Sequence, residues 1–154
     1  MGFRMSTLLL TVTFVLAMTP LGPKSTALAV DLQATTTIYL PNIVKMLGGA
    51  DGWTTPFIVQ NVGTNSTNLT FEFRRFSDGA VVKSRTVAGL APGTSVFHAP
   101  NADTELAAGG QYSVVIKSFG SAVVAVVNEH QNEANPQRQE ALSYDGLTSG
   151  STKV

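Results

Sequence analysis

The stretch NLTFEFRRFSDGAVVKSRTV, residues 68–87, decides the fold. Apolar and polar residues alternate in its first half, which places them on opposite faces of an extended strand. The alternating sets are Leu69, Phe71 and Phe73 on one face and Thr70, Glu72 and Arg74 on the other. Ser77-Asp78-Gly79 then has the composition of a hairpin turn, and residues 81–87 return as a second strand. The sequence predicts a β-hairpin whose first strand has one dry and one wet face.

The returning strand carries two basic residues, Lys83 and Arg85, on the same face. The other face carries Val82, Ser84 and Thr86. Charges along a strand discourage pairing with a further strand, so this segment is predicted to lie at the edge of a sheet. Together with Arg74-Arg75 the same charges would form a basic stripe across the hairpin. Because Glu72 balances them, we favour edge protection over a binding stripe.

Period-two apolar patterns recur along the chain between Gly, Pro, Asn and Asp, and no sustained 3.6-residue period is present after residue 30. The strands expected beyond the hairpin cover residues 35–40, 54–62, 95–98, 112–118, 122–127 and 142–144. Seven to eight short strands at this spacing predict an all-β fold. We expect an antiparallel two-sheet β-sandwich, Ig-like, in preference to a closed barrel.

Three local features refine this expectation. Pro41 cannot donate to a strand ladder and is expected to close the first strand, at an edge or a strand end. Residues 122–127 are apolar on both faces, which predicts a central strand buried from either side. Residues 128–139 are strongly polar and include Pro136, so they are expected to form a long exposed loop.

The first 29 of the 154 residues resemble a secretory signal peptide. Arg4 supplies a basic start, an apolar run follows from Leu8 to Met18, and Ala27-Leu28-Ala29 is a site of the kind that signal peptidase cuts. The run is shorter than the roughly 20 residues that span a bilayer. We expect a leader over residues 1–29, a sandwich domain over 30–146 beginning at Val30, a flexible tail over 147–154, and a secreted or surface location.

Composition supports a secreted single domain. The leader carries Arg4 and Lys24 and no acidic residue, so eight basic and ten acidic residues remain, a net charge of −2. No basic patch calls for nucleic acid. The chain has no cysteine, which excludes disulfides and thiol chemistry and leaves core packing to hold the domain together.

Several short motifs follow one another along the chain: Tyr39-Leu40-Pro41, the block from Trp53 to Gly63, the block from Leu90 to Ser95, Gly120-Ser121-Ala122-Val123-Val124, Val126-Val127-Asn128 and Tyr144-Asp145-Gly146. Their order resembles that of a β-sandwich module of large secreted surface proteins from filamentous Chloroflexi-type bacteria. The resemblance covers most of residues 38–146 and implies a surface or matrix role without catalytic residues. Such modules usually occur in tandem, whereas this sequence holds one copy.

The sequence lacks a recognisable catalytic set. Its two histidines, His98 and His130, are separated by several expected strands, neither lies in an H-E-x-x-H arrangement, and no G-x-S-x-G elbow is present. We predict a protein that is not an enzyme and has no cofactor.

Two polar segments contain groups that bind metals elsewhere. Glu129-His130 with Glu133 offers carboxylate and imidazole ligands. Residues 101–105 have alternating oxygen ligands but lack the glycine and distal glutamate of an EF-hand. Solvated loops are the favoured interpretation of both segments, and no metal site is predicted.

Trp53, the single tryptophan, opens a strand after Gly52. We favour a plug over the end of the core, and the alternative is an aromatic platform for a sugar. In that alternative the chain is a carbohydrate-binding module in which Asn101, Asp103 and Gln131 assist Trp53. Asn65 and Asn68 begin glycosylation sequons, which are plain turn residues in a bacterium.

The preferred functional expectation is a non-enzymatic structural or adhesive surface module. Its expected partners are surface or matrix proteins, glycans, or further copies of the chain joined through sheet edges. The uncharged, Thr-rich segment 34–40 could add to a neighbour's sheet edge, although pairing within its own sandwich is favoured.

Overall fold

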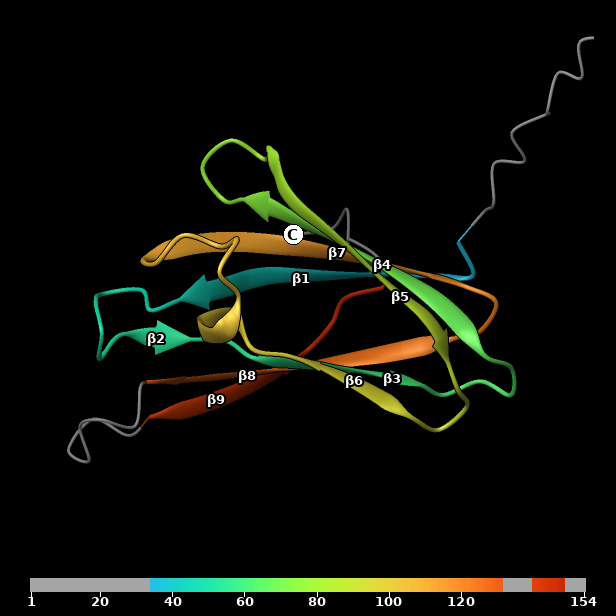
Figure 1. Cartoon of the computed structure of the whole chain (residues 1–154). Coiled ribbons are helices and arrows are strands. Elements are labelled where there is room, and N and C mark those ends of the chain that lie inside the picture. Colours follow the sequence, from blue (N-terminus) through green and yellow to red (C-terminus); the bar gives the residue numbers. More distant parts are fainter. Residues whose placement is uncertain (1–33, 132–139, 149–154) are drawn as a thin grey trace, which may run out of the picture. The chain divides into compact units, whose positions relative to one another are not determined.

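The computed structural model describes residues 34–131 and 140–148, and strands dominate this part of the chain (Figure 1). In chain order they are β1 (Thr36–Lys45), β2 (Trp53–Thr54), β3 (Phe57–Asn61), β4 (Thr67–Arg75), β5 (Val81–Leu90), β6 (Ser95–His98), β7 (Gly110–Phe119), β8 (Val123–Gln131) and β9 (Ala141–Asp145), with one 3-10 turn, η1 (Pro100–Ala102), before β7. They form two antiparallel sheets that pack face to face, which confirms the predicted β-sandwich.

The sheets divide the strands in an order that differs from that of an immunoglobulin constant domain. One sheet has the order β1-β7-β4-β5, and the other has the order β2-β8-β3-β6 with β9 beside β8. In the immunoglobulin domain the first two strands share a sheet. Here β1 pairs with β7, while β3 lies in the opposite layer. The described residues contain nine strands instead of seven to eight, because Thr55-Pro56 interrupts the expected strand 54–62.

The hairpin predicted from residues 68–87 is confirmed. Leu69, Phe71 and Phe73 are at most 2% exposed, and Gly79 takes a φ of 71° in the turn. β5 is the last strand of its sheet, so the predicted edge position is also confirmed. Its basic residues face inward: Arg85 lies opposite Phe71 and Lys83 opposite Phe73, and directly opposed residues share a face.

The core lies between the two sheets and is filled by alternate residues from both. Its fully buried large side chains are Phe57, Phe71, Phe73, Ile38, Leu40, Ile43, Leu69, Ile116, Val44, Val59, Val114 and Val127. The Phe57 ring lies 6.0 Å from that of Phe71 and 6.3 Å from that of Phe73, so it joins the layers. Because no cysteine is available, this packing carries the stability of the domain.

Pro41 does not end the first strand, contrary to the expectation. β1 continues to Lys45, and its pairing with β7 shifts register between Leu40 and Ile43. A bulge accommodates the missing N–H, since β1 is the end strand of its sheet. The segment 34–40 pairs with β7 of its own sandwich, as favoured.

The expectation that residues 122–127 are buried on both faces is wrong. β8 lies inside its sheet, but Val124 and Val126 are 46% and 38% exposed while Val123, Ala125 and Val127 are buried. The second layer covers only one face of this strand. β8 also includes residues 128–131, expected as loop, because β2 and β9 supply partners. Residues 132–139 lie outside the described part.

β9 and the residues that follow it close one open edge of the sandwich. The hydroxyl of Tyr144 donates to the Asn42 carbonyl at 2.5 Å and accepts from the Asn42 N–H at 3.3 Å. Burial raises the pKa of Tyr144 to about 12, which keeps the hydroxyl a donor. Leu147, assigned by sequence to a flexible tail, exchanges two backbone hydrogen bonds with Tyr39. The expected leader lies outside the described residues, among which no helix is long and apolar enough to cross a membrane.

Candidate functional site

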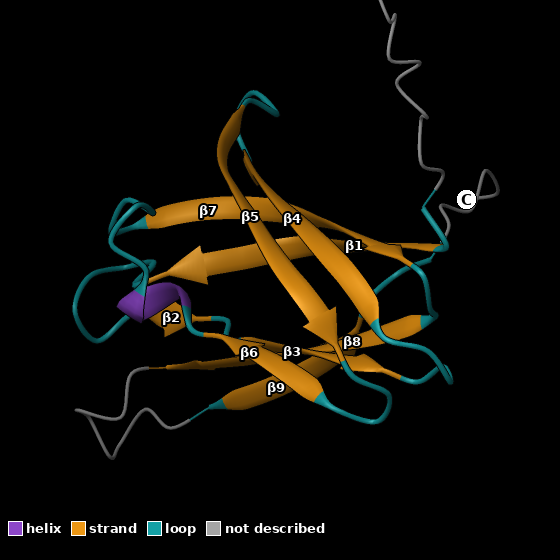
Figure 2. Ribbon diagram, turned by 45° about the vertical axis from the view of Figure 1, so that its right-hand side comes forward, coloured by secondary structure: helices purple, strands orange, loops and turns teal. Residues whose placement is uncertain are grey.

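The opposite edge of the sandwich, between β5 and β6, is closed by charged side chains. We call this group the charged seam; it consists of Lys83, Arg85, His98, Asp103 and Glu105. β5 supplies the first two residues from one sheet, and β6 with the segment after it supplies the others. Figure 2 shows that segment, including η1, crossing from the five-stranded layer towards the four-stranded one. A depression of about 400 Å³ opens at the seam.

Lys83 is the centre of the seam. Its Nζ donates to both carboxylate oxygens of Asp103, at 2.7 and 2.6 Å, and lies 2.7 Å from Oε2 of Glu105. The Lys83 and Asp103 side chains are only 14% and 6% exposed, whereas that of Glu105 is 66% exposed. Burial disfavours the charged forms of Lys83 and Asp103, but the hydrogen bonds between them outweigh this effect. The pKa of Lys83 is therefore raised and the pKa of Asp103 is lowered.

His98 sits beneath this ion pair, against the aromatic core. Its ring lies 5.0 Å from Phe57 and 4.9 Å from Phe73. Burial, opposed by the charge of Asp103 and assisted by Arg85, lowers the pKa of His98 to about 4. The imidazole is therefore neutral at neutral pH.

The hydrogen-bond partners assign the proton of that imidazole. Nδ1 of His98 is 3.3 Å from Nη1 of Arg85, which can only donate, so Nδ1 accepts and Nε2 carries the proton. Nε2 is buried and lies 3.4 Å from Oδ2 of Asp103, but it makes no hydrogen bond. The carboxylate and the imidazole are therefore neighbours without being joined as an acid–base pair. The seam residues include no hydroxyl or thiol nucleophile, so a hydrolytic triad is not assembled from them.

A second lysine fixes the segment that carries Asp103. Lys45 is 8% exposed, and its Nζ donates to the backbone carbonyls of Asp103 and Leu106 at 2.5 and 2.9 Å. The N–H of Glu105 donates to Oδ1 of Asp103 at 3.1 Å. The Asp103 carboxylate is consequently held in place from several directions. Sequence reasoning did not find Lys45, because its partners are backbone atoms.

The four residues proposed for ligand binding do not converge. Trp53, which is half-buried, pairs with Gln131 across β2 and β8, and Asn101 accepts a hydrogen bond from Thr54 at 2.9 Å. These three lie at the β2 end of the sandwich. Asp103 instead points into the charged seam, where Lys83 occupies both of its oxygens, so it does not face a ligand at that end.

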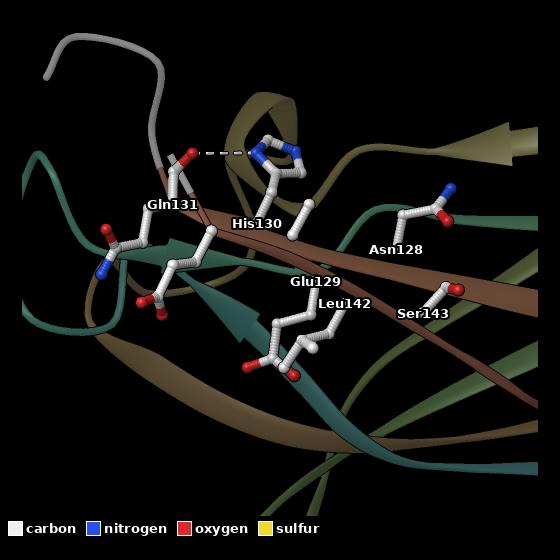
Figure 3. Close-up of a pocket in the computed structure, with 8 residues that line it drawn as sticks. Asn128, Glu129, His130, Gln131, Leu142 and Ser143 are labelled. Atoms are coloured by element: carbon white, nitrogen blue, oxygen red, sulfur yellow. Dashed lines mark hydrogen bonds between the residues drawn. The ribbon is translucent and has the colours of Figure 1, made fainter. Parts of the chain in front are cut away.

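Neither candidate metal segment gathers its ligands. The lysine on Asp103 takes the place that a cation would need in the 101–105 segment. Glu129 and His130 are neighbours on β8 and point to opposite faces (Figure 3). Glu133 lies outside the described residues, among which no cluster of three metal-binding side chains is present.

A cavity of about 530 Å³ lies along β8 and β9 (Figure 3). Its lining residues are Asn128, Glu129, His130, Gln131, Glu140, Ala141, Leu142 and Ser143. Figure 3 shows Glu129 and Leu142 on one side of the strands and His130 on the other, where its Nδ1 lies 3.0 Å from the carbonyl of Gln131. Polar groups that diverge in this way do not form a catalytic constellation.

The outer face of the five-stranded sheet exposes an apolar row, and two of its members, Val124 and Val126, were expected in the core. Phe97 on β6 lies opposite Ile58 on β3, which lies opposite Val126 on β8. These residues are 57%, 38% and 38% exposed, and Val124 continues the row. Residues 122–127 are apolar on both faces of the strand. Such a pattern is compatible with an exposed apolar face as well as with a strand buried on both sides.

The basic residues of the hairpin do not form a stripe. Arg74 pairs with Glu72 at 2.6 Å and Arg75 with Asp78 at 2.7 Å, while Lys83 and Arg85 face inward. The favoured interpretation, balanced charges at an edge, agrees with this arrangement.

The comparisons with known proteins bear only on the fold. No protein-family model and no curated protein matches the chain. Among solved structures, the crystal structure of Thermotoga maritima 1070 is similar, with a TM-score of 0.56 over 75% of this chain and 96% of that one. The two sequences are 14% identical, a level at which the similarity concerns the architecture.

Proposed function

We propose that the chain is a non-enzymatic extracellular adhesive module that contacts neighbouring surface proteins through the apolar row on its five-stranded sheet. That row is the observation that carries the proposal. An uncovered apolar patch across neighbouring strands is typical of a protein contact surface. The secretory character of residues 1–29 and the surface-module resemblance support the location.

The chemistry of the row favours a protein partner over a polyanion. Phe97, Ile58 and Val126 carry no charge, and the neighbouring outward residues Gln60 and Ser95 are neutral, while the exposed Asp145 opposite Val126 is an anion. Such a face gains free energy by burial against another apolar surface, and offers no cation to a phosphate or sulfate. The ionisable groups of the seam are engaged with one another at the sandwich edge.

The test is sedimentation of the purified protein with cell envelopes of the organism that produces it. Phe97→Ser should weaken binding several-fold. Phe76→Ser is the matched control, since Phe76 is 59% exposed on the hairpin turn and outside the row. Protease treatment of the envelopes should abolish binding. Equal binding by both variants, or binding that survives protease and is lost after glycan removal, would contradict the proposal.

A carbohydrate-binding function is the second candidate, and the proximity of Trp53, Asn101 and Gln131 around β2 favours it. A half-buried indole with the Gln131 amide side chain opposite it on the neighbouring strand offers stacking and hydrogen bonding to a sugar. Glycan-array binding that disappears in Trp53→Ala, with the fold retained, would support this candidate over the adhesive one.

A further inference from the structure

The contact between Lys83 and Asp103 has the arrangement of two groups that can be joined covalently. The lysine Nζ lies within 2.7 Å of both oxygens of the carboxyl group, so the amine sits against the carbon between them. Both side chains are largely removed from solvent. Held in contact this way, an amine and a carboxyl group react with a large effective concentration, and the equilibrium shifts towards the amide.

A third group is in place to move protons. Oε2 of Glu105 is 2.7 Å from the same Nζ, and its side chain reaches the pair from the solvent side. A carboxylate at hydrogen-bond distance from an amine can take its proton and return it to a departing oxygen. Nζ of Lys83 thus contacts both the electrophilic carboxyl group of Asp103 and the proton carrier Glu105.

The surroundings hold the reacting groups still. The Phe73 ring lies 6.0 Å below Nζ of Lys83, and His98 packs on that ring. Lys45 anchors the backbone carbonyls on either side of Glu105, which fixes the segment bearing Asp103. Positioning of this kind is the main requirement for a reaction between neighbouring side chains.

We propose that Lys83 and Asp103 form an intramolecular isopeptide bond. The reaction proceeds from the minor form of the ion pair, in which a proton has passed from the ammonium to the Asp103 carboxyl group to give a neutral amine and a neutral acid. The amine attacks the carboxyl carbon, forming the Nζ–Cγ bond, and Glu105 transfers the second Nζ proton to the oxygen that leaves. The Cγ–O bond breaks, one water molecule departs, and no oxidant or further reactant is consumed.

The bond would join the two sheets at the edge formed by β5 and β6. Lys83 belongs to β5 of one sheet, and Asp103 follows β6 of the other. In a chain without cysteine it would supply the covalent link that disulfides give to many exported domains. Such a bond modifies the chain itself and does not depend on which partner the domain binds.

Intact mass and peptide mapping of the purified full-length protein test the proposal. The expected mass is lower than that of the sequence by one water molecule, and digestion should release one branched peptide that joins the segments around residues 83 and 103. Lys83→Arg and Asp103→Ala should each have the full mass of their sequences. Glu105→Gln should fold, as judged by circular dichroism, and form the bond much more slowly.

Two controls separate this reaction from others. Lys117→Arg changes a lysine that also contacts a carboxylate, Glu72 at 3.3 Å, and should keep the mass deficit. Cyclisation at an Asp-Gly sequence such as Asp145-Gly146 also loses water but yields only linear peptides. A folded wild-type protein with full mass, or a deficit without the branched peptide, would overturn the proposal.

Discussion

Acid should destabilise the domain through His98 before its carboxylates titrate. The pKa of His98 falls from an ordinary 6.5 to about 4 because the ring is buried. Between these values the unfolded chain binds a proton that the folded protein does not, so the free energy of unfolding falls as the pH falls. At about 1.4 kcal/mol per pKa unit, the full loss is about 3 kcal/mol, and about 2 kcal/mol of it should appear by about pH 5.

Urea unfolding at about pH 7 and about pH 5 measures this loss, because the transition midpoint reports the free energy directly when the slope is unchanged. The pKa values of Glu72, Asp78 and Asp103 are lowered in the folded protein, so their contributions to the free energy of unfolding are lost mainly below about pH 5. These carboxylates therefore change the stability little between about pH 7 and about pH 5. Burial is the largest cause of the His98 shift, so the effect should remain if Lys83 and Asp103 are joined.

Two variants decide the assignment. His98→Gln keeps a polar side chain of similar size without a titrating ring, and should lose most of the difference between the two pH values. His130→Gln leaves the surroundings of His98 intact and should retain it. An equal loss in His98→Gln and the wild type, or a wild-type loss under about 1 kcal/mol, would contradict a role of His98 in the acid sensitivity.

Three further outcomes are expected. Phe73→Ala should cost about 3 to 5 kcal/mol in urea unfolding, whereas Glu72→Ala, which removes surface ion pairs to Arg74 and Lys117, should cost under about 1 kcal/mol; similar costs would mean that the faces of β4 are misassigned. Gly146→Ala should cost about 1 to 3 kcal/mol, because a Cβ would lie 2.3 Å from Cγ2 of Ile38, and unchanged thermal stability would contradict this packing. The protein should not dimerise by exchange of β1, since that strand pairs with β7 of its own chain. Binding of an added peptide of residues 34–40 to the intact protein in gel filtration would contradict this.

The hairpin could be predicted from sequence because alternation of apolar residues assigns faces within one strand. The same alternation did not reveal that Lys83 and Arg85 point inward. Their face depends on the register between β4 and β5, which shifts between Phe73 and Arg74 so that Lys83 opposes Phe73 while Val81 opposes Arg74. A shift of one residue moves a side chain to the other face, and no local pattern encodes it.

The charged seam was beyond sequence reasoning for a related reason. Asp103 stood out for its oxygen-rich segment, and Lys83 for its edge strand, but nothing in either pattern couples them. Their contact depends on the segment after β6 crossing to the opposite sheet. Long-range polar contacts of this kind carry no periodicity, so candidate ligand residues chosen by composition included one that is already paired.

The motifs that carry the surface-module resemblance make contacts that hold the turns and edges of the sandwich in place. Asn61 donates from its amide to the carbonyl of Leu90 at 2.9 Å, which ties the Trp53–Gly63 block to the Leu90–Ser95 block. Gly63 packs so close to Ser121 that a Cβ would overlap its hydroxyl, and Tyr144 holds the bulge after Leu40-Pro41. Each motif thus contacts another, and together they position turns and edges. Such motifs report the fold; the choice of partner must come from residues outside them or from their outward-facing positions, as at Phe97 and Ile58.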